Sequence, residues 1–263
     1  MKTYPALVLA GYSTEKPDPL AIAMGVERKS LIPVVGRPMV YWVVKALQES
    51  SHIDQIYIVG MSADDQVDFG TDVIYVPNQN AHFDNIMAGV DAIKEHQPDA
   101  EFLLIASADI PTLQPHTIDW FIETCESMEG DLFYSVVEKS VMEAVFPDSR
   151  RSYVPVVEGK LCGGDLFFVR RSIVHNNEHL VRKLLAKRKS PLQQARLLGF
   201  KTIVKFLFRR LSVRDAEELS ERLLQARGHV IISPYADLGM DVDKPHQLEM
   251  VRAQMQKRLE ARA

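Results

Sequence analysis

The stretch that decides the fold is residues 6–39, which opens as ALVLAG at residues 6–11 and closes as KSLIPVVGRPM at residues 29–39. Its first residues are apolar without polar alternation, which is typical of a strand buried in a parallel sheet. Ligands of such sheets bind beyond the carboxyl ends of the strands, so the loop after this strand is a natural phosphate site. Phosphates require backbone N–H donors and a cation; Gly11 lets the backbone approach them closely, and Lys29 supplies a positive charge.

Short apolar runs alternate with longer amphipathic segments along the rest of the chain. We expect strands at residues 6–10, 55–59, 73–76, 102–106, 132–137, 166–169 and 229–233, and helices at 39–48, 86–95, 115–127 and after 243. This rhythm predicts a three-layer α/β/α, Rossmann-like fold, with helices on both faces of a mixed, mainly parallel sheet. We expect a single domain over residues 1–263, with an added helical segment at about 177–227.

Glycines are expected to punctuate these elements. Gly130 and Gly228 are predicted to end the helices before them, and Ser212 with Asp215 has the spacing of a capping box. Gly163-Gly164-Asp165 is interpreted as a turn that feeds the strand at 166–169. Residues 138–153 show no regular pattern.

Composition limits the class of protein. The chain is 46% hydrophobic and 25% charged, as in ordinary globular proteins. No apolar run approaches the roughly 18 residues that span a bilayer, and the N-terminus lacks the pattern of a signal peptide. We therefore expect no transmembrane segment and a cytoplasmic location. Cys125 and Cys162 lie far apart without metal-ligand spacing, so neither a disulfide framework nor a zinc site is indicated.

Positive charge is concentrated in one region of a chain whose net charge is −4. Residues 180–214 contain eleven Lys and Arg and no acidic residue. Lys201, Lys205 and Arg209 recur every fourth position opposite apolar residues, which predicts an amphipathic helix with a cationic face. Four interpretations stay open: a solvated helix, peripheral membrane contact through 197–211, a homo-oligomer contact, or attraction of a phosphorylated acceptor. No aromatic residues interleave a basic groove, which argues against a nucleic-acid partner.

A carboxylate follows the predicted strand FLLIA at residues 102–106, in the sequence SADIP at 107–111. A hard cation that bridges phosphate oxygens prefers carboxylate ligands and keeps several waters, so Asp109 suits one side of a Mg²⁺ site. Asp109 as a turn or N-cap residue before the helix at Pro115 is the alternative. A second acidic pair, Asp241 and Asp243, stands before the last helix; two residues apart on extended chain, these side chains point to the same side.

Together these motifs resemble the MobA-like nucleotidyltransferases of GT-A-like fold, which include molybdenum cofactor guanylyltransferases and the nucleotidyltransferases of isoprenoid and sugar-phosphate metabolism. That family opens with Leu-Ala-Gly-Gly or Leu-Ala-Ala-Gly, a glycine-rich loop ending in Arg, then Lys and a Val-x-Gly-x-Pro-Met/Leu turn. The matching residues are Leu9, Ala10, Gly11, Lys29, Leu31, Val35, Gly36, Pro38 and Met39. The family's G-x-G-x-R is replaced by residues 12–16, and the loop to Lys29 is longer; Lys16 or Arg28 is the candidate for the missing arginine.

The resemblance also implies roles for individual residues. It implies that the nucleotide contacts Leu9, Ala10, Gly11, Lys16, Arg28, Lys29 and Asn85. It implies that Asp109 binds the metal, and the segment GMDVDKPHQL at 239–248 is similar to the family's closing Asp-x-Asp-x-Pro-x-x-Leu. We favour Asp243 over Asp241 as the second ligand, with N-capping of the last helix as the alternative for either. By position, Gly163, Gly164 and Asp165 form the acceptor-side loop.

The resulting expectation is a Mg²⁺-dependent nucleotidyltransferase, with Mn²⁺ as an alternative metal and with Lys29 and Asp109 as catalytic residues. It transfers a nucleoside monophosphate from an NTP to a small, phosphorylated acceptor and releases pyrophosphate. Two alternatives come from other classes: a glycosyltransferase that uses a nucleotide sugar and the Asp241/Asp243 pair, and a non-catalytic nucleotide-binding module. The sequence leaves the base and the acceptor open.

Overall fold

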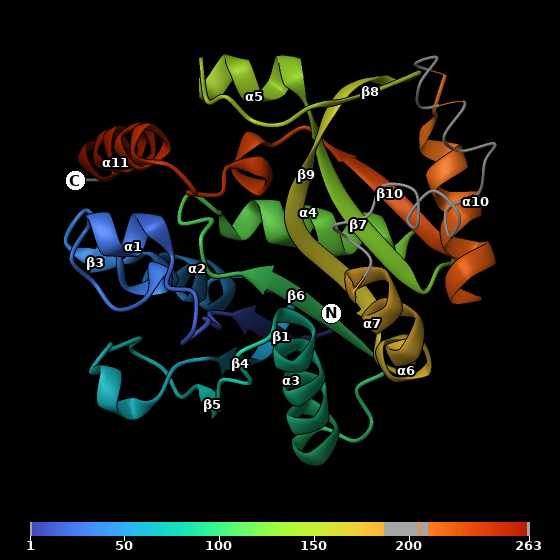
Figure 1. Cartoon of the computed structure of the whole chain (residues 1–263), viewed down its shortest axis with the longest axis horizontal. Helices are drawn as coiled ribbons and strands as arrows, with labels where there is room; N and C mark the ends of the chain where they lie inside the picture. The colour runs from blue at the N-terminus through green and yellow to red at the C-terminus, as the bar shows by residue number, and fades with distance from the viewer. Residues whose placement is uncertain (1, 187–204, 206–209, 262–263) are drawn as a thin grey trace.

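Most strands of the described residues belong to one mixed sheet. A computed structural model describes residues 2–186, 205 and 210–261, and in this part of the chain eight strands pair in the order β10-β7-β9-β6-β1-β4-β5, with β8 beside β9 (Figure 1). Their bounds are β1 Tyr4–Leu9, β4 Ile53–Val59, β5 Ile74–Val76, β6 Phe102–Ser107, β7 Leu132–Glu138, β8 Val154–Val156, β9 Gly159–Arg170 and β10 Gly228–Ser233. β9 runs antiparallel to β6, β7 and β8, whereas β1, β4, β5 and β6 are mutually parallel and β10 is parallel to β7. The predicted mixed, mainly parallel sheet is confirmed.

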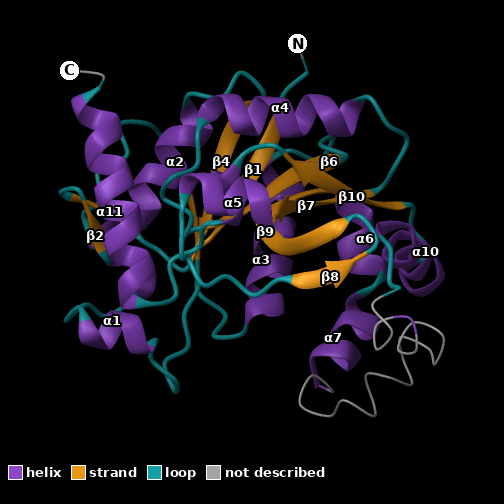
Figure 2. Ribbon diagram, turned by 90° about the horizontal axis from the view of Figure 1, so that it is seen from above, coloured by secondary structure: helices purple, strands orange, loops and turns teal. Residues whose placement is uncertain are grey.

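Helices cover both faces of this sheet, as Figure 2 shows for α2 and α4 on one side and α3 on the other. The helices are α1 Pro19–Ala23, α2 Met39–Gln48, α3 His82–His96, α4 Pro115–Glu126, α5 Lys139–Val145, α6 Arg171–Asn176, α7 Glu178–Ala186, α10 Val213–Leu224 and α11 Pro245–Glu260. Short elements complete the chain: η1 Lys29–Leu31, η2 Ala63–Asp65, η3 Ala236–Gly239, and the hairpin β2 Pro33–Val34 and β3 Arg37–Pro38. The three-layer prediction is therefore confirmed.

Two apolar cores hold the layers together. One lies between the sheet and α2 and α4 and includes Val8, Val43 and Phe121. The other lies under α3 and includes Leu7 and Val90. Adjacent residues of β1 thus face opposite cores, which explains why the strand is apolar without alternation.

The register of the central strands positions the site. Leu9 at the end of β1 is the partner of Val59 in β4 and of Ser107 in β6. The three carboxyl ends therefore meet at the same edge of the sheet. Residues that follow these strands, among them Gly11 and Asp109, are brought together although about a hundred positions separate them.

Three glycine predictions were wrong, each for a physical reason. Gly163 and Gly164 lie inside β9 and form no turn. Helix α4 ends with Ser127 as its C-cap, before Gly130 is reached. Gly130 is instead required by packing, because a Cβ added to it would meet the ring of Phe133. Helix α10 ends with Gln225 in the left-handed conformation, and Gly228 begins β10. The capping box of Ser212 and Asp215 is confirmed.

The predicted basic helix falls mostly outside the described residues, since Lys201 and Arg209 are not among them. Lys205 is described, and its ammonium pairs with Asp215. Within the described part of the chain, no helix has the length and apolarity to cross a membrane. Cys125 and Cys162 are both buried and unbridged.

Candidate active site

The ammonium group of Lys29 joins two acidic residues from distant parts of the chain. Its Nζ atom lies 2.5 Å from Oδ2 of Asp109 and also pairs with Oδ1 of Asp243. The side chains of Lys29 and Asp109 are 19% and 18% exposed, whereas that of Asp243 is 53% exposed. Two carboxylates thus converge on one cation at the open edge of the sheet.

Hydrogen bonds hold the two acidic residues, Asp109 and Asp243, in place. Asp109 follows β6, and its Oδ1 accepts a hydrogen bond of 2.5 Å from Ser107 Oγ. The carbonyl oxygen of Asp109 accepts a bond of 3.0 Å from the N–H of Val242, which ties the strand end to the segment carrying Asp243. The N–H of Asp243 donates to Gln247 Oε1 at the start of α11.

The environment keeps the lysine charged. Burial by itself lowers the pKa of Lys29, but the charge of Asp109 and the hydrogen bonds to Asp109 and Asp243 outweigh it and raise that pKa above its ordinary value. Lys29 therefore carries its positive charge throughout the neutral pH range.

None of Asp109, Asp241 and Asp243 is the N-cap of a helix. The N-cap positions of α4 and α11 are Gln114 and Lys244. The N-cap alternative for Asp109, Asp241 and Asp243 was therefore wrong, whereas Asp109 does lie in a turn after β6.

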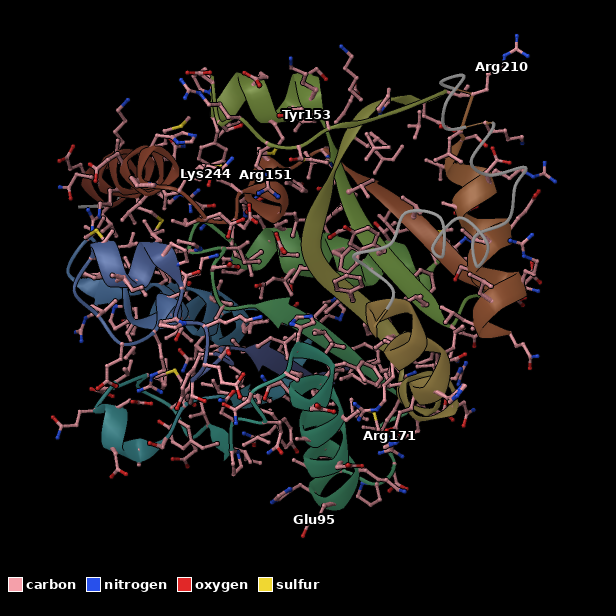
Figure 3. All side chains as sticks on the ribbon, viewed as in Figure 1. Glu95, Arg151, Tyr153, Arg171, Arg210 and Lys244 are labelled. Carbon is pink, nitrogen blue, oxygen red and sulfur yellow. The ribbon has the colours of Figure 1, made fainter. Side chains whose placement is uncertain are left out.

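Asp241 faces a different cation. It forms an ion pair with Arg151, and both side chains are largely buried, at 16% and 13% exposure. Figure 3 labels Arg151, and it also labels Lys244, which follows this acidic segment in the sequence. Arg151 was missed by sequence reasoning, because it follows α5 in a stretch without any pattern and its partner is 90 positions away.

Asp165 is a buried carboxyl group close enough to Asp109, Arg151 and Lys29 for their charges to act on it. Desolvation by burial, and then the charge of Asp109, raises its pKa to about 7, while Arg151 and Lys29 act in the opposite direction. Its Oδ2 atom is buried and has no hydrogen-bond partner among the described residues. Such an orphaned acceptor is costly in a folded protein unless a ligand or water satisfies it.

The glycines before Asp165 are required by close packing. An added Cβ at Gly164 would lie 2.9 Å from the carbonyl oxygen of Ser135, and one at Gly163 would overlap the hydroxyl of Tyr134. The pair therefore lets β9 approach β7 next to the site. This packing needs small residues within a strand, where sequence reasoning expected a turn.

Asn85 is buried, and both polar atoms of its side-chain amide form hydrogen bonds with neighbouring loop residues. Its Oδ1 accepts from the N–H of Gln79 at 2.6 Å, and its Nδ2 donates to Asn78 at 3.3 Å. Asn78 in turn bonds both backbone polar groups of Tyr12. Gly11 packs against this amide so tightly that an added Cβ would lie 2.8 Å from Asn85 Cγ. Asn85 and Gly11 together set the path of the loop after β1.

The two candidates for the missing loop arginine have different surroundings. Arg28 pairs with Asp65, donates to the carbonyl oxygen of Gly60 at 3.0 Å and stacks over the ring of Tyr12. Among the described residues, the side chain of Lys16 has no ion pair. Lys16 is thus the more available cation of the two.

A cavity of about 620 Å³ collects most of the predicted residues. It is lined by Leu9, Ala10, Gly11, Lys16, Arg28, Lys29 and Asp109, together with Ser107 and His82. Gly164 and Asp165 line a separate neighbouring cavity, and Asn85 touches a small one of about 220 Å³ beside Gly11. A larger cavity of about 880 Å³ opens at the other end of the strands, beside Tyr4, and contains none of these residues.

The arrangement of Asp109 and Asp243 fits a divalent cation. Each directs one oxygen at the same cationic atom, Lys29 Nζ, which occupies the position between the two carboxylates. Mg²⁺ is commonly held by one or two carboxylates, with substrate phosphates and waters as the other ligands. Within the described residues no group of three or more His, Cys, Asp or Glu is arranged around a metal position, so the fit is to a site that the substrate completes.

Comparison with known proteins identifies the family of the chain. The family model of the MobA-like NTP transferase domain matches residues 6–194. A solved structure titled a hypothetical transferase from Thermus thermophilus is 30% identical, with a TM-score of 0.82, over 94% of this chain and 100% of that one. No curated protein matches the chain.

Two more distant structures share the fold. A CMP:2-keto-3-deoxy-manno-octonic acid synthetase complexed with CTP is 15% identical, with a TM-score of 0.60 over 98% of this chain and 100% of that one. A 4-diphosphocytidyl-2C-methyl-D-erythritol synthase from Anaerococcus prevotii is 14% identical, with a TM-score of 0.57 over 97% of this chain and 96% of that one. The match of the family model over most of the chain decides the assignment: this protein belongs to the family of MobA-like NTP transferase domains.

Proposed function

We propose that this NTP transferase, acting as one domain, transfers a nucleoside monophosphate from an NTP to a small acceptor and releases pyrophosphate. The observation that carries the proposal is the convergence of Asp109 and Asp243 on Lys29, beside the loop that begins at Gly11. Carboxylates and a fixed cation at the carboxyl edge of a parallel sheet suit a triphosphate and its metal.

The loop after β1 holds the triphosphate in this proposal. The N–H of Gly11 is the donor proposed to face the phosphates, since those of Ala10 and Tyr12 donate to Val59 and Asn78. Lys16 contributes a further positive charge. Arg28 holds the loop in place through Asp65 and Gly60. Asn85 acts through the loop, because its amide supports the chain at Gln79 and Asn78.

Asp109 and Asp243 are proposed to hold Mg²⁺, or alternatively Mn²⁺. When bound, the metal neutralises charge on the phosphate oxygens. Lys29 then leaves the two carboxylates for the phosphates and stabilises the charge that develops on the leaving pyrophosphate. Asp241 is proposed to fix the segment through Arg151 and not to serve as a ligand.

The reaction is an in-line displacement at the α-phosphorus. A phosphate or hydroxyl oxygen of the acceptor forms the new P–O bond, the bond between the α-phosphorus and its bridging oxygen breaks, and pyrophosphate leaves with the electron pair. A hydroxyl acceptor loses its proton to solvent, and an ionised phosphate oxygen carries none. No side chain forms a covalent intermediate, so positioning and electrostatics supply the rate. Gly163, Gly164 and Asp165 border the acceptor side.

The two alternative functions are less well supported by the geometry. A glycosyltransferase would use Asp241 and Asp243 together, yet these residues face different cations, Arg151 and Lys29. A non-catalytic module needs no paired carboxylates beside the phosphate loop.

The test is incubation with each of the four NTPs, Mg²⁺ and a panel of phosphorylated and hydroxyl acceptors. Pyrophosphate release that requires an acceptor and is lost in Asp109→Asn supports transfer. NTP binding without release under every condition supports the module, and transfer from a nucleotide sugar supports the glycosyltransferase.

A further inference from the structure

An apolar cavity of about 430 Å³ lies directly beside the phosphate cavity. The two cavities share Leu9, His82 and Ser107 in their walls. A molecule in the apolar cavity therefore lies next to the phosphate site. Its volume is within the range of small-molecule binding sites.

The walls of this cavity change character along its length. Away from the phosphate site they are mainly apolar, with Ile105, Phe167, Val169 and Ile173 among them. Phe167 stacks on Tyr134, with ring centroids 4.6 Å apart, and stays 36% exposed. Large apolar walls left open to water are unfavourable, and an apolar ligand would relieve that cost.

Polar groups gather where the two cavities meet. Ser107 and Asp165 line this end, and Asp165 Oδ2 is the buried acceptor that has no partner among the described residues. A ligand with an O–H donor at this point would satisfy it. Asp165 is also close enough to Asp109 for the charge of Asp109 to act on it, so a head group bound here is beside the metal-binding carboxylates.

We propose that this cavity binds the acceptor, and that the acceptor is an amphiphile: an alcohol or its monophosphate on a hydrocarbon body. The inference rests on the proposed function and names its substrate class. An alcohol head, or a monophosphate head through its remaining P–OH, donates to Asp165 and presents an oxygen to the α-phosphorus. The body packs between Phe167 and Ile173. Transfer yields a nucleoside monophosphate ester from an alcohol, or a nucleoside diphosphate ester from a monophosphate, with pyrophosphate as the other product.

Binding is tested without nucleotide, by calorimetry with butyl, hexyl and octyl phosphate and with the matching alkanols below their aggregation concentrations. Each buried CH₂ is expected to tighten binding roughly threefold to fourfold. The head group that binds more tightly in each pair identifies the alcohol or the monophosphate as the natural acceptor. Affinity that does not change with chain length in either series would overturn the inference.

Two variants locate the binding site. Phe167→Glu places a carboxylate in the cavity wall and is expected to abolish the dependence on chain length. Ile232→Glu is the matched control, since Ile232 is an exposed apolar residue at 42% on β10, outside this cavity. Thermal unfolding checks both variants, and Phe167→Ser replaces Phe167→Glu if the latter does not fold. Equal chain-length dependence in the wall variant and in wild type would place the ligand elsewhere and contradict the inference.

A transfer assay separates this inference from the proposed function. With Mg²⁺ and the four NTPs, octyl phosphate or octanol should outperform glycerol 3-phosphate or glycerol as the acceptor. Efficient transfer to the hydrophilic acceptors alone refutes the amphiphile and leaves the nucleotidyltransferase standing. Chain-dependent binding without transfer from any NTP supports the cavity and contradicts the proposed function.

Discussion

The Nζ atom of Lys29 lies 2.5 Å from Oδ2 of Asp109, although 80 positions separate the two residues in the sequence. The contact exists because the ends of β1 and β6 are neighbours in the sheet and the phosphate loop returns to this edge at η1. Lys29 there also meets Asp243, so one side chain links the three sequence motifs of the family. Its cationic charge has two partners in the described residues, the same two carboxylates that we propose for the metal.

Replacing Lys29 should lower turnover and leave the fold intact. Lys29→Ala is expected to reduce kcat by about 10²- to 10³-fold, the usual effect of removing one group that stabilises charge in the transition state. Lys45→Ala is the control, because Lys45 forms an exposed pair with Glu49 on α2. Steady-state pyrophosphate release measures both variants. A Lys29→Ala enzyme with unchanged kcat would remove Lys29 from the chemistry.

Substitution of Asp109 or Asp243 should weaken metal binding, whereas substitution of Asp241 should not. Asp109→Asn and Asp243→Asn are expected to weaken Mn²⁺ binding by roughly 100-fold, since even residues behind metal ligands are worth roughly 10- to 100-fold. Electron paramagnetic resonance of free Mn²⁺, titrated with protein and NTP, measures this affinity.

Asp241→Asn provides the contrast. It should keep its Mn²⁺ affinity but lower the free energy of unfolding by about 3 kcal/mol, because it removes the ion-pair partner of the buried, charged Arg151. Loss of metal binding in Asp241→Asn, with retention in Asp243→Asn, would reverse the assignment.

The path of the phosphate loop depends on the absence of a side chain at Gly11. Gly11→Ala should destabilise the protein by about 1 to 3 kcal/mol and raise KM for NTP, because its Cβ collides with the amide of Asn85. Asn85→Ala removes that amide, so the double variant should be less destabilised than the sum of the single ones. Denaturant unfolding of the four proteins gives the coupling, and strict additivity would show that the two positions are independent.

Asp165 should make stability fall as pH rises. Burial and Asp109 raise its pKa from 3.8 to about 7, so between these values the native state keeps a proton that the unfolded state has lost. The native state then binds more protons, and this contribution to the free energy of unfolding decreases from about pH 4 to about pH 7.

The isosteric variant tests this account of Asp165. In EDTA, Asp165→Asn should be more stable than wild type above pH 7, and the difference should shrink toward pH 4. Denaturant midpoints across this range measure it. A difference between the two proteins that does not vary with pH would show that Asp165 titrates normally.

The two loop cations should have different roles. Lys16→Ala is expected to raise KM for NTP about tenfold, the effect of about 1.4 kcal/mol of lost binding, at unchanged stability. Arg28→Ala should lower the free energy of unfolding by about 2 kcal/mol, since Arg28 donates charged hydrogen bonds to Asp65 and to Gly60. Nucleotide titrations and thermal unfolding of both variants are the measurements; the opposite pattern would identify Arg28 as the phosphate ligand.

Much of the fold was predictable because its core elements are dictated by local patterns. Helix α2 has the predicted bounds, Met39–Gln48, since a Pro precedes its apolar face. The strand before Asp109 was predictable from its continuous apolar run, which only burial on both faces requires. The meeting of Asp109 with Lys29 then follows from the rule that strand ends share one edge.

What could not be predicted depends on neighbours distant in the sequence. The pair Gly163-Gly164 is compatible with a turn and with a strand that packs closely against its neighbour. Only the positions of Tyr134 and Ser135 distinguish the two. Arg151 carries no local signal, because its role is set by Asp241. The cavity beside Phe167 is likewise absent from any linear pattern, as its walls come from several strands and helices.

The central claim is tested most directly by following the phosphorus atoms of the NTP. The protein, Mg²⁺ and an acceptor are incubated with NTP labelled with ³²P at either the α or the γ position, and the products are separated. We predict that the α label appears in the acceptor product and the γ label in pyrophosphate, and that Asp109→Asn abolishes both. An acceptor that stays unlabelled with all four α-labelled NTPs, while the protein still binds NTP, would contradict nucleotidyl transfer.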